Sequence, residues 1–99
     1  MTTMYVTYVG NAATVFDHDY YVSVHLPLVM ECWSQYGLQS CGAFFPAGDG
    51  AGTIAIAECR FRDEAALRAA LGAPETPRVM SDVAKFTKAR PAQSVAGPV

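Results

Sequence analysis

The sequence has few charged side chains and none of the long apolar or basic runs that mark several protein classes. Charged residues make up 16% of its 99 residues, and the seven lysines and arginines form no run. With a formal net charge of −2, it lacks the positive patch that nucleic-acid binding requires. No apolar stretch approaches the length of a membrane span, and residues 1–5 carry no basic leader segment. We therefore expect a cytoplasmic protein that binds neither nucleic acid nor membrane.

Cysteine motifs are missing as well. Cys32, Cys41 and Cys59 are odd in number and widely spaced, with no CxxC pair among them. This usage predicts reduced, buried cysteines that behave as small apolar residues in an intracellular protein. None of the three has a local activator in the sequence, so a thiolate nucleophile is not expected.

The sequence also lacks the signatures of metal, nucleotide and flavin sites. Residues 46–52 are rich in glycine, but no GK[ST] follows and no helix is expected there, so they predict a flexible loop rather than a phosphate-binding loop. His18 has no metal-ligating partner at a useful spacing and is expected to be a solvated surface residue. We expect neither a cofactor nor a metal.

What the sequence does contain is a set of strongly apolar segments, since 52% of its residues are hydrophobic. Alternating β-forming residues predict strands over residues 4–9, 38–45 and 53–61, with a weaker one over about 91–95. In the first and third of these strands both faces carry apolar side chains. That pattern is typical of strands in a sheet that is covered on both sides.

Capping residues delimit two helices and a short third one. Asp17 is the expected N-cap of the first helix, which runs to about residue 36 and ends before Gly37. Asp63 caps a second helix that ends at Gly72. Thr76, followed by a proline, has the arrangement of an N-cap and a first helical residue and predicts the third helix.

The resulting order, β-α-β-β-α-β, predicts an α+β protein with a ferredoxin-like sandwich, in a single domain over residues 1–99. Helices of this fold cover one face of the sheet only. The apolar residues on the other face need a cover, and the simplest one is the same sheet from a second copy of the chain. We therefore expect a homodimer.

The candidate site lies on the first predicted helix. Asp17, Tyr21 and His25 are spaced at i, i+4 and i+8 and project from one helix face. A histidine can move protons near neutral pH, Tyr21 could hydrogen-bond to it or to a substrate oxygen, and Asp17 could orient Tyr21. Pro27 has no N–H for the Ser23 carbonyl, so we expect a bend that opens a pocket between helix and sheet.

Two interpretations of His25 are open at this stage. It is either a catalytic group in such a pocket or a hydrogen-bonded residue at the edge of the core, with Pro27 only setting the helix curvature. Large aromatic residues are more often core than binding surface, but one or two are expected to line an apolar cavity. The aromatic residues concerned are Trp33, Tyr36, Phe44, Phe61 and Phe86.

Three segments of the sequence resemble, in the right order, the EthD family, named for ethyl tert-butyl ether degradation. They are Phe16-Asp17-x-Asp19-Tyr20-Tyr21 leading to His25-x-Pro27-Leu28, then Tyr36-Gly37-Leu38, then Met80-Ser81-Asp82-Val83 followed by Phe86-Thr87. The resemblance covers almost the whole chain. It implies a dimeric α+β barrel, in which two ferredoxin-like sheets pack face to face. Proteins with related barrels include cofactor-free monooxygenases, polyketide cyclases and dehydratases, and lactone isomerases.

Together, the resemblance and the candidate site predict a protein of a degradation or biosynthesis pathway that acts on a small hydrophobic oxygenated molecule, aromatic or polyketide-like. The chemistry would be cofactor-free acid/base catalysis or oxygenation, as in a monooxygenase-like oxidoreductase or a cyclase or dehydratase. The alternatives are a non-catalytic binding or accessory protein of an oxygenase system, and a structural dimer with a closed core. The candidate catalytic residues are His25, Tyr21 and Asp17, and the candidate substrate-binding residues are Trp33, Phe86 and Thr87.

Overall fold

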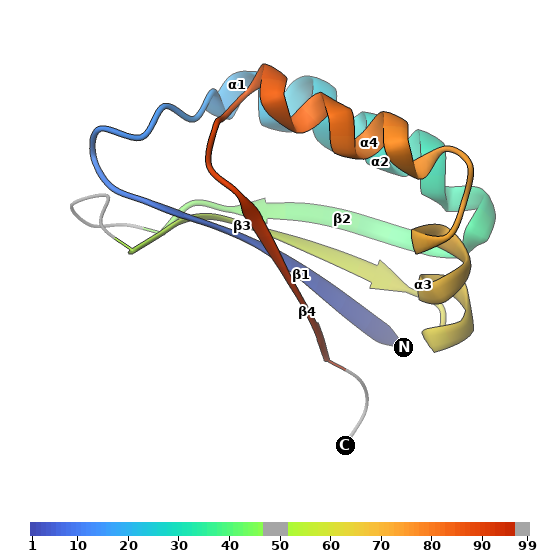
Figure 1. Ribbon diagram of the computed structural model, residues 1–99. Coiled ribbons are helices and arrows are strands. Elements are labelled where there is room, and N and C mark those ends of the chain that lie inside the picture. The colour runs from blue at the N-terminus through green and yellow to red at the C-terminus, as the bar shows by residue number, and fades with distance from the viewer. Residues whose placement is uncertain (47–51, 97–99) are drawn as a thin grey trace.

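In the computed structural model, which describes residues 1–46 and 52–96, one antiparallel sheet carries helices on a single face (Figure 1). Its strands stand in the order β2-β3-β1-β4. Every neighbouring pair is antiparallel, and the central pair, β1 and β3, extends from Thr2 opposite Phe61 to Gly10 opposite Gly52, with one shift of register between Tyr8 and Val9. The strands are β1 (Thr2–Gly10), β2 (Leu38–Phe44), β3 (Gly52–Phe61) and β4 (Pro91–Ala96). This is the ferredoxin-like arrangement, and the predicted α+β fold class is confirmed.

Two helical segments connect the strands. The first changes pitch three times along its length, and the second is split into two helices that are joined by a short turn (Figure 1). The first consists of α1 (His18–Tyr20), a π-helical turn (Tyr21–His25), α2 (Leu26–Trp33) and a 3-10 turn (Ser34–Tyr36). The second consists of α3 (Glu64–Leu71), α4 (Thr76–Asp82) and a 3-10 turn (Val83–Lys85).

The ends of the first helical segment lie where local sequence places them. The Asp17 carboxylate accepts a hydrogen bond from the Tyr20 backbone N–H at 3.0 Å, which makes Asp17 the N-cap. Gly37 ends the segment with φ of +108°, a conformation that glycine adopts without strain. Both predicted boundaries are therefore confirmed.

The interior of this segment departs from the expected α-helix with a bend at Pro27, because a π-helical turn comes directly before the second α-helical part. Residues Tyr21–His25 form a π-helical turn, in which the Leu26 N–H donates to the Tyr21 carbonyl. Proline has no N–H to donate, and in an α-helix its ring would clash with the carbonyl four residues earlier. The wider turn just before Pro27 accommodates both effects, and such turns are frequent at functional sites.

The second helical segment confirms one predicted cap and corrects another. Asp63 accepts a hydrogen bond from a backbone N–H of the first turn of α3 at 2.8 Å, as expected of an N-cap. Thr76, however, is not the cap of α4, because that position belongs to Glu75. The Thr76 hydroxyl is buried, where it accepts the indole N–H of Trp33 at 3.0 Å and donates to the Ala70 carbonyl. A buried tryptophan needs such an acceptor.

The core fills the space between the helices and one face of the sheet. Every second residue of β1 and β3 points into this space. These strand side chains pack against the apolar side of α2. The buried residues are Met4 and Tyr8 on β1, Ala55, Ala57, Cys59 and Phe61 on β3, and Leu26, Val29, Cys32 and Trp33 on α2. Residues 47–51 of the expected glycine-rich loop lie outside the described part of the chain.

None of the helices in the described part of the chain packs on the opposite face of the sheet (Figure 1). Tyr5 and Ile56 are only half-buried there, and Phe44 at the edge of that face is 54% exposed. The sheet therefore has apolar side chains on both faces, as the strand patterns predict, and one of these faces is open. Within the described residues, no helix is both long and apolar enough to cross a membrane.

Candidate functional site

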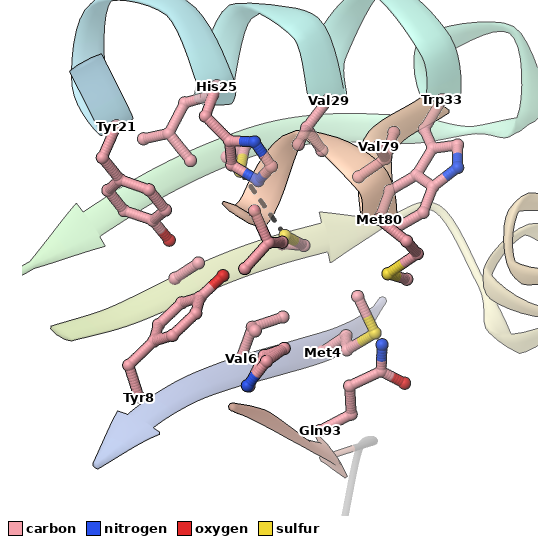
Figure 2. A pocket seen from close by; sticks show the side chains of 16 residues that line it. Met4, Val6, Tyr8, Tyr21, His25, Val29, Trp33, Val79, Met80 and Gln93 are labelled. Atoms are coloured by element: carbon pink, nitrogen blue, oxygen red, sulfur yellow. Dashed lines mark hydrogen bonds between the residues drawn. The ribbon is translucent and has the colours of Figure 1, made fainter. Parts of the chain in front are cut away.

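A cavity lies between the sheet and the first helical segment, next to the π-helical turn (Figure 2). We call it the central cavity. Together with its mouth, the cavity has a volume of about 430 Å³ between the lining atoms. Its wall is mainly apolar, and exposed residues such as Met80 and Gln93 lie at its mouth. A few polar groups in an apolar pocket are typical of small-molecule sites.

His25 lines this cavity from the end of the π-helical turn. Its side chain is buried, and its Nδ1 lies 3.0 Å from Oδ2 of Asp82 at the end of α4. Because a carboxylate only accepts hydrogen bonds, Nδ1 must carry the hydrogen of this pair. In the neutral ring the other nitrogen, Nε2, then has a free lone pair. No described residue hydrogen-bonds to Nε2.

Asp82 is itself buried and held by two hydrogen bonds. Besides His25, the Tyr20 hydroxyl donates to its Oδ1 at 2.8 Å, and the Lys85 ammonium lies 3.8 Å from the same oxygen. Burial would raise the pKa of Asp82, but the hydrogen bonds from His25 and Tyr20 outweigh burial and lower this pKa. Asp82 is thus a carboxylate at neutral pH and fixes the orientation of the imidazole.

The pKa of His25 is shifted in the direction that suits a proton acceptor. Burial lowers the pKa of the imidazole, and the hydrogen bond with Asp82 opposes this effect without cancelling it. The ring is therefore neutral at neutral pH. A neutral histidine with its Nδ1 hydrogen fixed on a carboxylate can accept a proton at Nε2.

Tyr8 on β1 and Tyr21 on the π-helical turn add two hydroxyls to the central cavity. Neither hydroxyl hydrogen-bonds to a described residue. In the described part of the chain, every fully buried side-chain oxygen or nitrogen has a hydrogen-bond partner. The two hydroxyl oxygens are therefore not fully buried and border the open space of the cavity. Figure 2 shows both of them pointing into the space between sheet and helix. Burial is the main cause that raises the pKa of each phenol. Both hydroxyls therefore stay protonated and can donate hydrogen bonds.

Aromatic packing fixes the positions of these groups. The rings of Tyr21 and His25, one turn apart, are nearly parallel, with centroids 5.5 Å apart and an interplanar angle of 16°. Phe86 packs against both, at centroid distances of 4.9 Å from Tyr21 and 4.7 Å from His25, and Tyr8 meets Phe86 edge to face at 5.8 Å. Such contacts restrict the rings and stabilise the fold beyond simple burial.

The six candidate residues from the sequence fall into two groups. His25, Tyr21 and Trp33 line the central cavity together. The other three, Asp17, Phe86 and Thr87, line a separate groove near residues 84–89. Asp17 is exposed and engaged in capping rather than directed at Tyr21, and the Thr87 hydroxyl donates to the Val15 carbonyl at 2.7 Å.

Sequence reasoning missed two members of the site, Tyr8 and Asp82. Tyr8 lies on the same strand face as Met4 and Val6, and this face forms part of the wall of the central cavity. Asp82 stands three residues after the buried Val79 on the third predicted helix, a spacing that turns it inward. A carboxylate on the apolar side of a short helix was the available signal.

The buried neutral His25 has a consequence for stability. The pKa of His25 is lower in the folded state than in the unfolded state. Between the folded pKa and about 6.5, the unfolded chain therefore binds a proton that the folded chain does not. The free energy of unfolding should therefore fall from about pH 7 to pH 5 and level off below the folded pKa. Urea denaturation over this range tests it. In the His25→Gln variant, the free energy of unfolding should depend less on pH. The control variant, His18→Gln at an exposed histidine, should keep the pH dependence of the wild type.

Fold and site define a class: a ferredoxin-like α+β protein with a cavity between its sheet and its first helical segment. No family model matches the sequence, and no curated protein is significantly similar to it. Solved structures of this class do match over nearly the whole chain. They include a cofactor-independent oxygenase from Streptomyces nogalater, with a TM-score of 0.62 and 16% identity over 98% of this chain and 90% of that one.

Within this class the fold is that of the EthD-like proteins. An EthD-like protein from Ralstonia eutropha superposes with a TM-score of 0.81 at 19% identity, covering 96% of this chain and 88% of that one. An ethyl tert-butyl ether degradation (EthD) family protein from Bacillus halodurans gives a TM-score of 0.75 at 17% identity, covering 100% and 99%. The resemblance found in the three sequence segments is thus confirmed in the fold.

Proposed function

We propose that the chain is an EthD family member that binds a small, mainly apolar molecule bearing at least one oxygen and moves a proton on it. The observation that supports this is the polar set of the central cavity. His25 Nε2 and the hydroxyls of Tyr8 and Tyr21 face an apolar space without partners among the described residues. Polar atoms in such surroundings favour a ligand that supplies the missing hydrogen bonds.

The three groups suit distinct roles in one proton transfer. His25, neutral and held by Asp82, removes a proton from a hydroxyl or an activated C–H of the bound molecule. The resulting oxyanion is stabilised by hydrogen bonds from the hydroxyls of Tyr8 and Tyr21, which burial keeps protonated. Return of the proton to another atom gives isomerisation, cyclisation or dehydration. Reaction of the carbanion with molecular oxygen gives oxygenation.

A matched pair of probes tests the binding part of the proposal. Phenol and toluene have similar shapes, but only phenol can hydrogen-bond to the cavity groups. We expect phenol to bind more tightly by about fivefold, because one hydrogen bond stabilises by about 1 kcal/mol. Calorimetric titration of each probe measures this ratio. Equal affinities would contradict the proposed role of the polar set.

The catalytic part needs a screen of phenols, hydroquinones and β-dicarbonyl compounds, followed by product analysis and by an oxygen electrode. Turnover that depends on His25 supports acid/base chemistry, and oxygen consumption identifies the oxygenase branch. Binding of phenol without turnover of any compound would favour the accessory role, in which the protein holds or delivers its ligand for another enzyme. If neither phenol nor any compound of the screen binds, the remaining interpretation is a structural dimer with a closed core.

We also propose a homodimer in which two sheets pack face to face. It is supported by the half-buried Tyr5 and Ile56 and the exposed Phe44, which lie on the open face of the sheet. We expect a dimer at micromolar concentration in sedimentation analysis. Ile56→Glu should shift it to monomer, since an unpaired charge in such an interface is costly. Leu71→Glu, at an exposed leucine of α3, is the control, and a wild-type monomer would contradict the proposal.

A further inference from the structure

Two cysteines meet in the wall of the central cavity. Cys41 on β2 and Cys59 on β3 stand opposite each other in the antiparallel register, and their Sγ atoms are 3.4 Å apart in a thiol–thiol hydrogen bond (dashed line in Figure 2). Residues directly opposite in antiparallel strands have Cα atoms about 4.5–5.5 Å apart, which lies inside the range of about 4.4–6.8 Å that disulfides span. The backbone therefore already holds this pair at the separation that a disulfide needs.

The two thiols differ in access. Cys41 is half-buried and borders both the central cavity and a shallow groove next to Leu26, Pro27 and Met30. Cys59 is only 3% exposed, and it borders the central cavity. A small solute in the groove thus meets Cys41 alone, whereas one in the central cavity can meet either thiol.

The pair also differs in acidity. The hydrogen bond from the Cys59 thiol lowers the pKa of Cys41, although burial acts in the opposite direction. The same hydrogen bond, together with burial, raises the pKa of Cys59. Since the thiolate is the reactive form of cysteine, these effects favour Cys41 as the attacking sulfur and leave Cys59 as a thiol beside it.

We propose that Cys41 and Cys59 form a redox-active dithiol, which a small peroxide oxidises to a disulfide in the wall of the central cavity. The Cys41 thiolate attacks one peroxide oxygen, the O–O bond breaks, and a sulfenic acid forms while the leaving oxygen takes up a proton. The Cys59 sulfur then attacks the Cys41 sulfur, its proton passes to the departing hydroxyl, and water is released. Two electrons pass from the sulfurs to the peroxide.

Disulfide formation changes the cavity with little movement of the backbone. The two sulfur atoms need to approach by about 1.4 Å, since a disulfide bond is about 2.05 Å long. Two thiols that can each donate a weak hydrogen bond become a group that can only accept. The inference concerns residues outside the proposed acid/base set, so it stands or fails independently of the proposed function.

Disulfide mapping of the wild-type protein tests the proposal directly. The protein is exposed briefly to hydrogen peroxide, remaining thiols are alkylated under denaturing conditions, and the chain is cut without reduction. Trypsin is unsuitable, because it cuts after lysine and arginine, the first of these is Arg60, and all three cysteines therefore stay in one peptide. Chymotrypsin can separate them by cleavage after Trp33, Tyr36 and Phe44. We expect a Cys41–Cys59 cross-linked peptide and an alkylated Cys32.

Single cysteine variants sharpen the assignment. Cys32→Ser should form the same cross-link, because Cys32 lies on α2 and contributes nothing to the pair. Cys59→Ser should accumulate a sulfenic acid on Cys41 that dimedone traps. Wild-type protein in which Cys41 and Cys59 are both fully alkylated after peroxide treatment would overturn the proposal. So would a cross-link that joins two chains or includes Cys32.

Discussion

Phe86→Ala is expected to lower the free energy of unfolding by about 3–5 kcal/mol, a large part of the stability of a small domain. Phe86 is 2% exposed and contacts the rings of Tyr8, Tyr21 and His25 at once. Removing its ring deletes apolar contacts and leaves a void behind the histidine, which the surrounding rings fill only in part. Urea denaturation measures the loss. It is done at about pH 7, where His25 is neutral and its protonation does not contribute to the difference.

Phe45→Ala is the matched control, because the Phe45 side chain is 36% exposed and packs at the rim of the same aromatic cluster. Loss of its ring contacts should cost about 1 kcal/mol. If both variants lose the same stability, the cluster does not have its centre at Phe86. The comparison thus separates a structural role of Phe86 from the substrate-binding role that its sequence pattern predicted.

His25→Gln is expected to reduce turnover of a substrate found in the screen by about 10²–10⁴-fold, the usual contribution of a positioned acid or base. Glutamine keeps much of the size of the side chain but cannot take up a proton. Binding of phenol should fall far less, since the hydroxyls of Tyr8 and Tyr21 still line the cavity. An unchanged kcat in this variant would contradict the proposed role of His25.

Asp82→Asn tests whether the carboxylate positions and tunes the histidine. The amide oxygen can still accept the Nδ1–H, but the negative charge that favours protonation of the ring is lost. We expect a lower kcat and a pH–rate profile whose acidic limb shifts to lower pH, because the pKa of His25 falls further. A purely structural role of Asp82 would reduce stability without moving that limb.

Local signals in the sequence were sufficient for most of the fold. Asp17 and Asp63 cap helices through hydrogen bonds within their own first turn, and Gly37 ends a helix by its own backbone conformation. The alternation in residues 53–61 separates the buried face of β3 from the open one. Each of these features depends on residues a few positions apart, which is the range that sequence patterns describe.

The site was only half predictable, since its key contact joins residues far apart in the chain. Tyr21 and His25 lie on the same helix face, so their spacing in the sequence predicted that they belong to one site. Asp82 lies 57 residues from His25, and only the packing of α4 against the first helical segment brings the two together. Thr76 was misassigned for a similar reason, because the demand of the buried Trp33 N–H outweighed its local capping preference.

The cysteines show the same limit in another form. Nothing near Cys41 or Cys59 in the sequence activates either thiol, and the sequence therefore predicted inert apolar residues. The pairing of β2 with β3 supplies the missing neighbour, as each cysteine becomes the hydrogen-bond partner of the other. Reactivity that arises from strand register is not visible in local spacing.

NMR spectroscopy of the imidazole nitrogens tests the central claim most directly. The chain has two histidines, so the His18→Gln variant leaves only the signals of His25. At about pH 7 we predict a neutral ring with its hydrogen on Nδ1 and a bare Nε2. Addition of phenol should shift the Nε2 signal, whereas toluene should not. A hydrogen on Nε2, a charged ring at this pH, or an Nε2 signal that ignores phenol would contradict the account.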